Sequence, residues 1–317
     1  MKNKPILIVA GEPYSIFFEI FFKSIKKEVY KSPLILICCK KNLITQMRKF
    51  NFKKKIRLLN QKKLDEKKID NNKINLINIE LDNSSKKKFK SNYIERCFNL
   101  AFQLIKDGYT DKLINGPVNK RTFLNKKFLG ITEYIASKFN IKKVGMLIYN
   151  KDLSVSPLTT HLPLKFVSKK ITKKLIKEKV MIINEFFKKE LMLNPKIAVV
   201  GLNPHCESVD KFNEDEKIVS SAIKSLVKKR VNVKGPYPAD TIFLKANRNK
   251  FDIVLGMYHD QVLTPIKSLF EYDAINITMG LPFLRVTPDH GPNEKMFGQN
   301  KSNPLSLIQS LNFLDKR

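Results

Sequence analysis

Residues Ile253–Lys267 read IVLGMYHDQVLTPIK, and this stretch decides how the rest of the chain is interpreted. Its first residues form an apolar run that is typical of a buried β-strand. His259 and Asp260 follow where that strand is expected to end, and Lys267 comes shortly afterwards. Open α/β sheets bind ligands at the carboxyl ends of their strands, so these three polar groups indicate a site. The alternative is an ordinary capped loop with solvated charges, and the local sequence is compatible with both.

Apolar runs of strand length alternate with amphipathic segments of helix length on both sides of this stretch. Strands are expected at 5–10, 33–39, 58–59, 74–81, 113–114, 144–149, 153–158, 196–200, 253–257, 274–278 and 283–286. Helices are expected at 15–30, 94–105, 132–139, 176–191, 215–227 and 304–314, the third of them capped by Thr132. This alternation predicts an α/β fold with a largely parallel sheet, in which 144–149 and 153–158 form a hairpin. No G-x-G-x-x-G motif follows the first strand, so a Rossmann fold is not expected.

The 317-residue chain carries a formal net charge of +31, which raises the question of a nucleic-acid partner. Lysine supplies most of the positive charge and is spread over many predicted helix faces, while arginine is scarce. No RNP, zinc-finger or basic-zipper pattern is present, so no specific nucleic-acid partner is expected. A basic nucleic-acid-binding protein stays the alternative from a different functional class. A positive surface also attracts phosphorylated substrates and dinucleotides.

The sequence has neither the long apolar stretch of a membrane-spanning protein nor the cysteine spacing of a disulfide-bonded one. No apolar stretch is long enough to cross a bilayer, so we expect a cytoplasmic protein without a membrane partner. The cysteines show neither a disulfide framework nor metal-ligand spacing, and we interpret them as reduced core thiols. They are Cys38, Cys39, Cys97 and Cys206.

Each histidine of the chain lies at or just after the end of a predicted strand. They are His161, His205, His259 and His290. Neutral imidazoles from separate loops are how a catalytic divalent-metal site with an open position is built. Spacing along the sequence does not show that they meet, and a single histidine is more often a hydrogen-bonded surface or core residue.

A set of long motifs surrounds these histidines. They are NGPVNK at 115–120, GITEYIA at 130–136, TTHLPL at 159–164, GLNPH at 201–205, GPYPADT at 235–241, MYHDQ at 257–261 and INITMGLPFLRVTPDHG at 275–291. In order and spacing, the chain resembles the family of 4-hydroxythreonine-4-phosphate dehydrogenase, the NAD-dependent oxidoreductase of pyridoxal phosphate biosynthesis. The resemblance runs from the first strand almost to the end of the sequence.

The resemblance implies a two-domain α/β/α sandwich like the isocitrate and isopropylmalate dehydrogenases, which is not a Rossmann fold. The first α/β domain would comprise residues 1–125 plus 280–317. The second, residues 126–279, would carry most of the metal-site motifs. A cleft between the domains and a homodimer with the site at its interface are also implied.

The resemblance assigns a metal and a cofactor to the strand ends. The implied metal ligands are His161, His205 and His259, and the ion would be zinc, magnesium, cobalt or manganese. The implied cofactor is NAD, with NADP left open, and the residues lining it would be His290 and Gly291. A secondary alcohol gives hydride to NAD⁺ only if its proton leaves too, and a metal lowers the pKa of that hydroxyl.

The resemblance also implies substrate contacts from Thr132, Lys267, Asn276 and Arg285. Cationic side chains suit an anionic substrate, and Arg285 does so through its planar fork. Lys267 and Asp240 are the candidate catalytic residues. Asp240 would either accept the proton or orient a metal-bound histidine, and the sequence leaves both roles open.

The implied reaction oxidises 4-phosphohydroxy-L-threonine to a β-keto acid that decarboxylates to 3-amino-2-oxopropyl phosphate, in pyridoxal 5′-phosphate (vitamin B6) biosynthesis. The chain departs from the family pattern at 14–18 and 292–295, and Ile131 replaces a histidine that touches substrate in the family. Isoleucine cannot donate a hydrogen bond there. A related dehydrogenase acting on threonate or erythronate 4-phosphate, or a non-catalytic metal-binding relative, therefore stays open.

Overall fold

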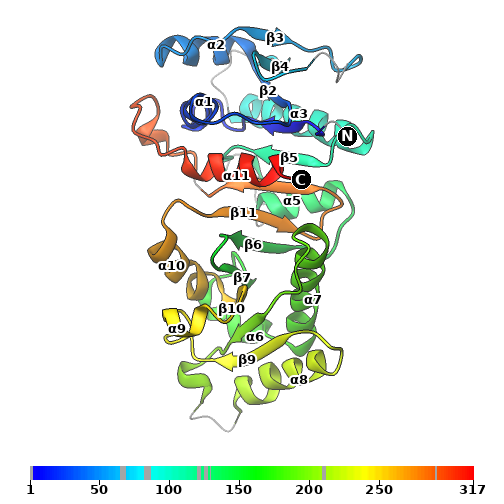
Figure 1. Cartoon of the computed structure of the whole chain (residues 1–317), viewed down its shortest axis with the longest axis vertical. Coiled ribbons are helices and arrows are strands. Elements are labelled where there is room, and N and C mark those ends of the chain that lie inside the picture. The colour runs from blue at the N-terminus through cyan, green and yellow to red at the C-terminus, as the bar shows by residue number, and fades with distance from the viewer. Residues whose placement is uncertain are drawn as a thin grey trace. The chain divides into compact units, whose positions relative to one another are not determined.

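The computed structural model describes residues 3–64, 69–81, 87–119, 123–124, 128, 130–208, 212–289 and 291–317. The chain divides into two compact units, one of residues 1–135 with 282–317 and one of residues 136–281. The elements of both are labelled in Figure 1. The expected division placed the limits at 125/126 and 279/280. Whether the units are separate domains with a cleft stays a prediction.

The first unit is built on a sheet whose strand order is β3-β4-β2-β1-β5-β12. Its neighbouring strands pair in parallel among the described residues. The strands are β1 (Ile6–Val9), β2 (Leu34–Cys38), β3 (Ile56–Leu58), β4 (Ile74–Asn78), β5 (Lys112–Asn115) and β12 (Leu284–Pro288). β1 and β2 are buried at every position, as expected when helices cover both faces of a parallel sheet.

The helices of the first unit alternate with these strands. They are α1 (Phe17–Lys27), α2 (Lys40–Lys49), α3 (Lys87–Lys106), α5 (Ile131–Lys138), the short η5 (Glu294–Met296) and α11 (Leu305–Asp315). Helices α1 and α11 contact each other and lie side by side in Figure 1. Helix α2 was not predicted, because it buries only Leu43 and Gln46 and has no continuous apolar stripe.

The second unit is built on a mixed sheet with the strand order β11-β6-β7-β10-β8-β9. Its strands are β6 (Gly145–Tyr149), β7 (Ser154–Thr159), β8 (Ile197–Val200), β9 (Val233–Tyr237), β10 (Ile253–Tyr258) and β11 (Ile275–Met279). β6 is antiparallel to both β7 and β11, which confirms the expected hairpin. The pairs β7–β10, β10–β8 and β8–β9 are parallel.

The helices of the second unit follow its strands along the chain. They are η2 (Leu164–Phe166), α6 (Val167–Lys170), α7 (Lys173–Glu190), η3 (Pro204–Cys206), the π-helical η4 (Asp215–Ser220), α8 (Ser221–Val227), α9 (Lys245–Arg248) and α10 (His259–Phe270). The side chain of Thr172 caps α7 by accepting from Leu175 N. The predicted apolar stripe of α7 is buried at Ile176, Val180 and Ile183. No described helix is long and apolar enough to span a membrane.

The parallel strands of the second unit position the histidines. β7, β10 and β8 run in the same direction, so their carboxyl ends lie at one edge of the sheet. His161 follows β7, His259 begins α10 directly after β10, and His205 lies in the loop after β8. Helix α10, which contains Pro265, was not anticipated in this stretch.

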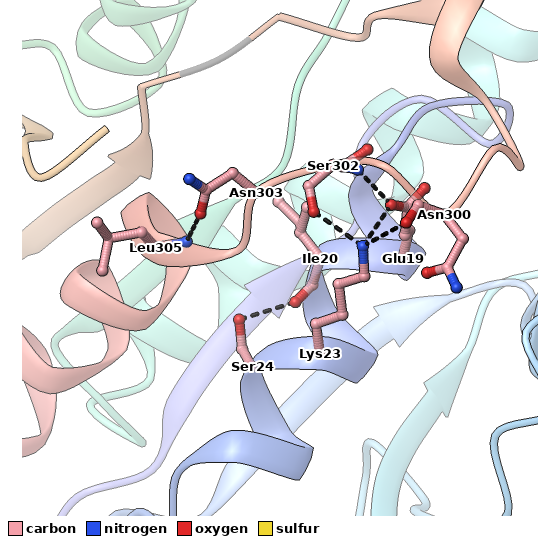
Figure 2. A network of polar contacts seen from close by, with 8 residues as sticks. All are labelled: Glu19, Ile20, Lys23, Ser24, Asn300, Ser302, Asn303 and Leu305. Carbon is pink, nitrogen blue, oxygen red and sulfur yellow. Dashed lines mark hydrogen bonds and ion pairs between the residues drawn. The ribbon is translucent and has the colours of Figure 1, made fainter. Parts of the chain in front are cut away.

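A buried carboxylate holds α1 to the segment before α11, as Figure 2 shows. Glu19 Oε1 accepts hydrogen bonds from Ser302 N at 2.6 Å and from Lys23 Nζ at 2.8 Å. Lys23 Nζ also donates to the carbonyl oxygens of Asn300 and Ser302. The side chain of Glu19 is only 1% exposed and that of Lys23 is 31% exposed, so one buried carboxylate oxygen accepts from both an amide and a partly exposed cation.

We predict that Glu19→Ala lowers the free energy of unfolding by about 2 kcal/mol, because the buried Ser302 amide loses a charged acceptor. Urea denaturation of the two proteins measures the difference. Lys26→Ala, an exposed change on the same helix, is the control and should stay within about 0.5 kcal/mol of the wild type. Equal stability of Glu19→Ala and the control would contradict this role of Glu19.

Candidate active site

Arg285 is the centre of a polar group in the first unit. Its side chain is 1% exposed, and its Nε donates to Asn115 Oδ1 at 2.9 Å. Its Nη1 donates to Thr132 Oγ1 at 3.1 Å. The expected role of Thr132 as a helix cap is wrong. Helix α5 begins at Ile131, and the Thr132 hydroxyl faces the guanidinium instead.

The loop after β5 is held against the first loop of the chain. Arg285 reaches this loop because β12 pairs with β5, with Arg285 opposite Leu113. A Cβ on Gly116 would collide with the carbonyl oxygen of Ala10, so only glycine allows this close approach. Glu12 N donates to the carbonyl of Pro117 at 2.9 Å.

Burial lowers the pKa of Arg285 to about 9, and the carboxylate of Glu133 acts in the opposite direction. The guanidinium therefore keeps its charge at neutral pH. Glu133 Oε2 is buried and has no hydrogen-bond partner among the described residues. A buried cation next to an unsatisfied acceptor is typical of a site that completes its contacts with a polar ligand.

Two of the expected metal ligands lie together in the second unit. The ring centroids of His161 and His259 are 6.3 Å apart, with 36° between the ring planes. His259 Nδ1 is 2.6 Å from Asp260 Oδ1. The carboxylate favours the tautomer that carries its proton on Nδ1, which leaves the Nε2 lone pair available for a metal. The chemistry of this donor pair fits a divalent ion.

The third expected ligand, His205, is not brought into a group with the other two. Within the ranges that the structure describes, no three His, Cys, Asp or Glu side chains are arranged to hold a metal. His205 lies in η3 with φ 55°, and Cys206 follows with φ 63°. Two consecutive residues in the left-handed region make this a strained loop. Cys206 is half-buried, so it is not the core thiol that we expected.

Hydrogen bonds connect the loops that carry the three histidines. Thr159 Oγ1, at the end of β7, donates to the carbonyl of Met257 at 2.8 Å. Met257 N donates to Gln261 Oε1 at 2.7 Å. Gln261 Nε2 donates to the carbonyl of Gly201 at 2.8 Å. Side chains thus join β7, the start of α10 and the loop after β8.

Asp215 holds the loop of His205 from the other side. Its Oδ1 accepts from Leu202 N at 2.6 Å, and its Oδ2 accepts from Asn203 N at 2.9 Å. The residue is fully buried. Burial raises the pKa of the nearby Cys206 thiol, and the negative charge of Asp215 raises it further. The thiol therefore stays neutral beside the carboxylate.

The remaining candidates of the second unit occupy separate elements. Lys267 is half-buried on α10, about two helical turns after His259. Asn276 lies on β11, and its Oδ1 is buried without a partner among the described residues. Asp240 is exposed after β9 and is close enough to raise the pKa of Cys206, so its charge acts next to His205.

The expected cofactor residues are described only in part. His290 lies outside the described residues, so the structure says nothing about it. Gly291 is described, and a Cβ built there would meet no atom within 4 Å. The space on the Cβ side of this glycine is therefore open.

The two segments that depart from the family pattern contact each other. Ile16 N donates to the carbonyl of Pro292 at 3.2 Å. The rings of Tyr14 and Phe297 meet edge to face, with centroids 6.1 Å apart. Phe17, in the first turn of α1, is fully buried. Tyr14 therefore contacts the segment after Gly291, while Phe17 fills buried space within the first unit.

The comparison with known families decides the relationship. The family model of the pyridoxal phosphate biosynthetic protein PdxA matches residues 31–314. The chain belongs to the PdxA family.

Individual PdxA relatives match almost the whole chain. A protein of Sulfurihydrogenibium sp. (strain YO3AOP1) named 4-hydroxythreonine-4-phosphate dehydrogenase is 35% identical over 319 residues, with 96% of each chain covered. A protein of Pectobacterium atrosepticum named D-threonate 4-phosphate dehydrogenase is 29% identical over 98% of each. The crystal structure of the Klebsiella pneumoniae 4-hydroxythreonine-4-phosphate dehydrogenase superimposes with a TM-score of 0.83, at 26% identity and 98% coverage of each chain.

These matches confirm the expected family, the α/β fold that is not a simple Rossmann fold, and an oxidoreductase. Membership of a dehydrogenase family implies a nicotinamide cofactor and a metal, without specifying either one. Sequence reasoning assigned no role to Asn115, which orients Arg285, or to Gln261. The available signal was their place at a strand end, within the motifs NGPVNK and MYHDQ.

We predict that Thr132→Val lowers the free energy of unfolding by about 1.5–3 kcal/mol. Valine has the same shape as threonine but no hydroxyl, so the buried guanidinium of Arg285 loses one hydrogen-bond acceptor. Thr132→Ser keeps the hydroxyl and is the matched control. Urea denaturation of the three proteins provides the comparison. If Thr132→Val and Thr132→Ser unfold at the same urea concentration, the hydrogen bond contributes nothing to stability.

Proposed function

We propose that this PdxA-family chain oxidises 4-phosphohydroxy-L-threonine with NAD⁺ and a divalent metal. The product is a β-keto acid that loses CO₂ to give 3-amino-2-oxopropyl phosphate in vitamin B6 biosynthesis. The observation that carries the proposal is the pairing of His161 with His259 at the carboxyl ends of β7 and β10. The chain belongs to a family whose named members are dehydrogenases, so we assign the histidine pair to metal binding in an oxidation.

The metal ligands in this proposal are His161, His259 and His205. A divalent ion bound there, zinc, magnesium, cobalt or manganese, supplies the Lewis acidity that favours loss of the hydroxyl proton. Asp260 holds His259 in the tautomer that presents Nε2. Asp240 either accepts the proton of the substrate or orients a liganding histidine, and its charge next to Cys206 is compatible with both roles.

Substrate binding in this proposal is shared by cations and by unsatisfied acceptors. Arg285 remains protonated at neutral pH and binds an anionic group of the substrate, with Thr132 beside it. Lys267 provides a second cation. Asn276 offers a buried oxygen that is free for a donor of the substrate. His290 and Gly291 would line the nicotinamide cofactor, which is NAD, with NADP left open.

The functional form in this proposal is a cytoplasmic homodimer. Large apolar side chains of the second unit are exposed in the single chain: Leu164, Phe166, Phe212, Leu244, Leu269 and Tyr272. Exposed apolar side chains of this size favour burial against a partner surface. A second copy of the chain is the partner that we propose.

The second candidate substrate is a threonate or erythronate 4-phosphate. Two observations favour it: the whole-length similarity to a protein named D-threonate 4-phosphate dehydrogenase, and Ile131 in place of a histidine. Isoleucine cannot hydrogen-bond to the substrate, so this position bears on which hydroxy acid is accepted. The reaction type and the metal site are the same for both candidates.

We predict NADH formation when the protein is mixed with NAD⁺, a divalent metal and 4-phosphohydroxy-L-threonine, and its loss with a chelator. Absorbance at the NADH band measures the reaction. His161→Ala should reduce the rate at least about 100-fold, since one of the ligands is lost. D-threonate 4-phosphate is tested in parallel, and a faster rate with it would make it the preferred substrate. No NADH with either substrate under any metal would overturn the proposal.

We predict that Ile131→His raises kcat/KM for 4-phosphohydroxy-L-threonine about tenfold, because the imidazole adds a hydrogen bond to the substrate. Ile131→Leu is the control, since it changes the shape of the side chain without adding a donor. Steady-state kinetics of the three proteins gives the comparison. An unchanged kcat/KM in Ile131→His would show that this position does not determine specificity.

A further inference from the structure

Two side chains hydrogen-bond to the backbone of the loop that carries His205. Gln261 donates to the carbonyl of Gly201 from one side. Asp215 accepts from the amides of Leu202 and Asn203 on the other side. Among the described residues, neither side chain forms a hydrogen bond with a histidine ring. Both act on the backbone that sets where His205 lies.

We propose that Gln261 and Asp215 are positioning residues that hold His205 in place for metal binding. The inference rests on the proposed function, which takes His161, His205 and His259 as ligands of one divalent ion, whereas the described residues of the single chain bring only His161 and His259 together. It goes beyond that function by assigning the geometry of the site to two residues that hydrogen-bond to the backbone of the His205 loop.

The loop needs such restraints because its backbone is strained. His205 has φ 55° and Cys206 has φ 63°, so two residues with side chains occupy the left-handed region in succession. That conformation persists only where the surrounding structure over-determines it. Gly201 shows how closely the surroundings approach, since a Cβ there would lie 2.7 Å from Cys206 Sγ and 3.0 Å from Asp215 Oδ1.

Asp215 is suited to this role by its burial and by its two acceptors. Its carboxylate is fully buried, and each oxygen accepts one backbone amide of the loop. A buried carboxylate is costly unless it is hydrogen-bonded, so its place here depends on those amides. Asn213 Oδ1 accepts from Asp215 N and thereby fixes the start of η4.

Gln261 is suited to this role because an amide side chain both donates and accepts. Its Oε1 accepts from Met257 N at the end of β10, while its Nε2 donates to Gly201 across the sheet edge. A glutamate of the same shape would keep the first bond and lose the second, because a carboxylate has no donor for a carbonyl. Gln261 also lies two residues after His259, so it ties one expected ligand to the loop of another.

The test is a Co²⁺ titration of the metal-free protein, followed by the visible absorption of the bound ion. Gln261→Glu removes the bond to Gly201, and Asp215→Asn places an amide donor against one of the two loop amides. We expect each variant to bind Co²⁺ about tenfold more weakly. At saturating Co²⁺ the absorption bands of the wild type should return, because the ligands themselves are unchanged.

The matched control is Asn150→Asp, which is also an amide-to-carboxylate change at a buried hydrogen-bonding position. Asn150 lies before β7, at the opposite end of that strand from His161, and donates to the carbonyl of Asp273. It should lose thermal stability but bind Co²⁺ as the wild type does. Should Asp215→Asn not fold, Gln261→Glu and the apolar Gln261→Met decide the question.

The outcomes separate this inference from the proposed function. Wild-type Co²⁺ affinity in both variants would overturn the inference even if the protein forms NADH. Weaker binding in the variants but not in Asn150→Asp, in a protein that forms no NADH, would support the inference and overturn the proposed reaction. Absence of Co²⁺ binding by the wild type, or binding that His205→Ala leaves unchanged, would overturn the inference through its premise.

Discussion

The parallel pairing of β7, β10 and β8 is the constraint on which the candidate metal site depends. Tyr258 lies opposite Thr159 in the ladder, so the residues that follow both strands emerge at the same level of the sheet. His161 and His259 meet for that reason, although they are far apart in the sequence. A slip of one residue in this register would turn alternate side chains to the other face and separate the pair.

The main feature of the candidate site in the first unit is a buried cation, the guanidinium of Arg285. Arg285 is surrounded by neutral oxygens of Asn115 and Thr132, with the carboxylate of Glu133 nearby. Hydrogen bonds to these two neutral oxygens orient the guanidinium. Burying an arginine in this way adds little to stability by itself, which suggests that function keeps it there.

The sequence predicts the strands and the long helices well because their burial is regular. The buried stripe of α7 and the fully apolar β10 follow from periodicity alone. Helix α2 could not be predicted, since charged and polar side chains make up most of it and tertiary contacts decide its state. Helix α10 was missed because Pro265 lies inside it, and proline normally argues against a helix interior.

The sequence predicted which residue types form the candidate site, but not which neighbouring residues hydrogen-bond to them or to their loops. Motif resemblance pointed to Arg285 and to the histidines, whereas the partners Asn115, Gln261 and Asp215 act through single oxygen or nitrogen atoms. Which atom faces which backbone group depends on the register of strands distant in sequence, and no local pattern encodes that information. The strained φ of His205 is likewise invisible until the loop after β8 is placed.

The contact between the first loop and the segment after Gly291 bears on the exchange of segments between family members. Tyr14 packs on Phe297 and Ile16 binds the carbonyl of Pro292, so each departure from the family pattern forms the surroundings of the other. A chimera that takes the first loop from a relative would replace the half-exposed Tyr14 and lose its edge-to-face contact with Phe297. The hydrogen bond from Ile16 to Pro292 joins backbone atoms, so it does not require a particular side chain in either segment.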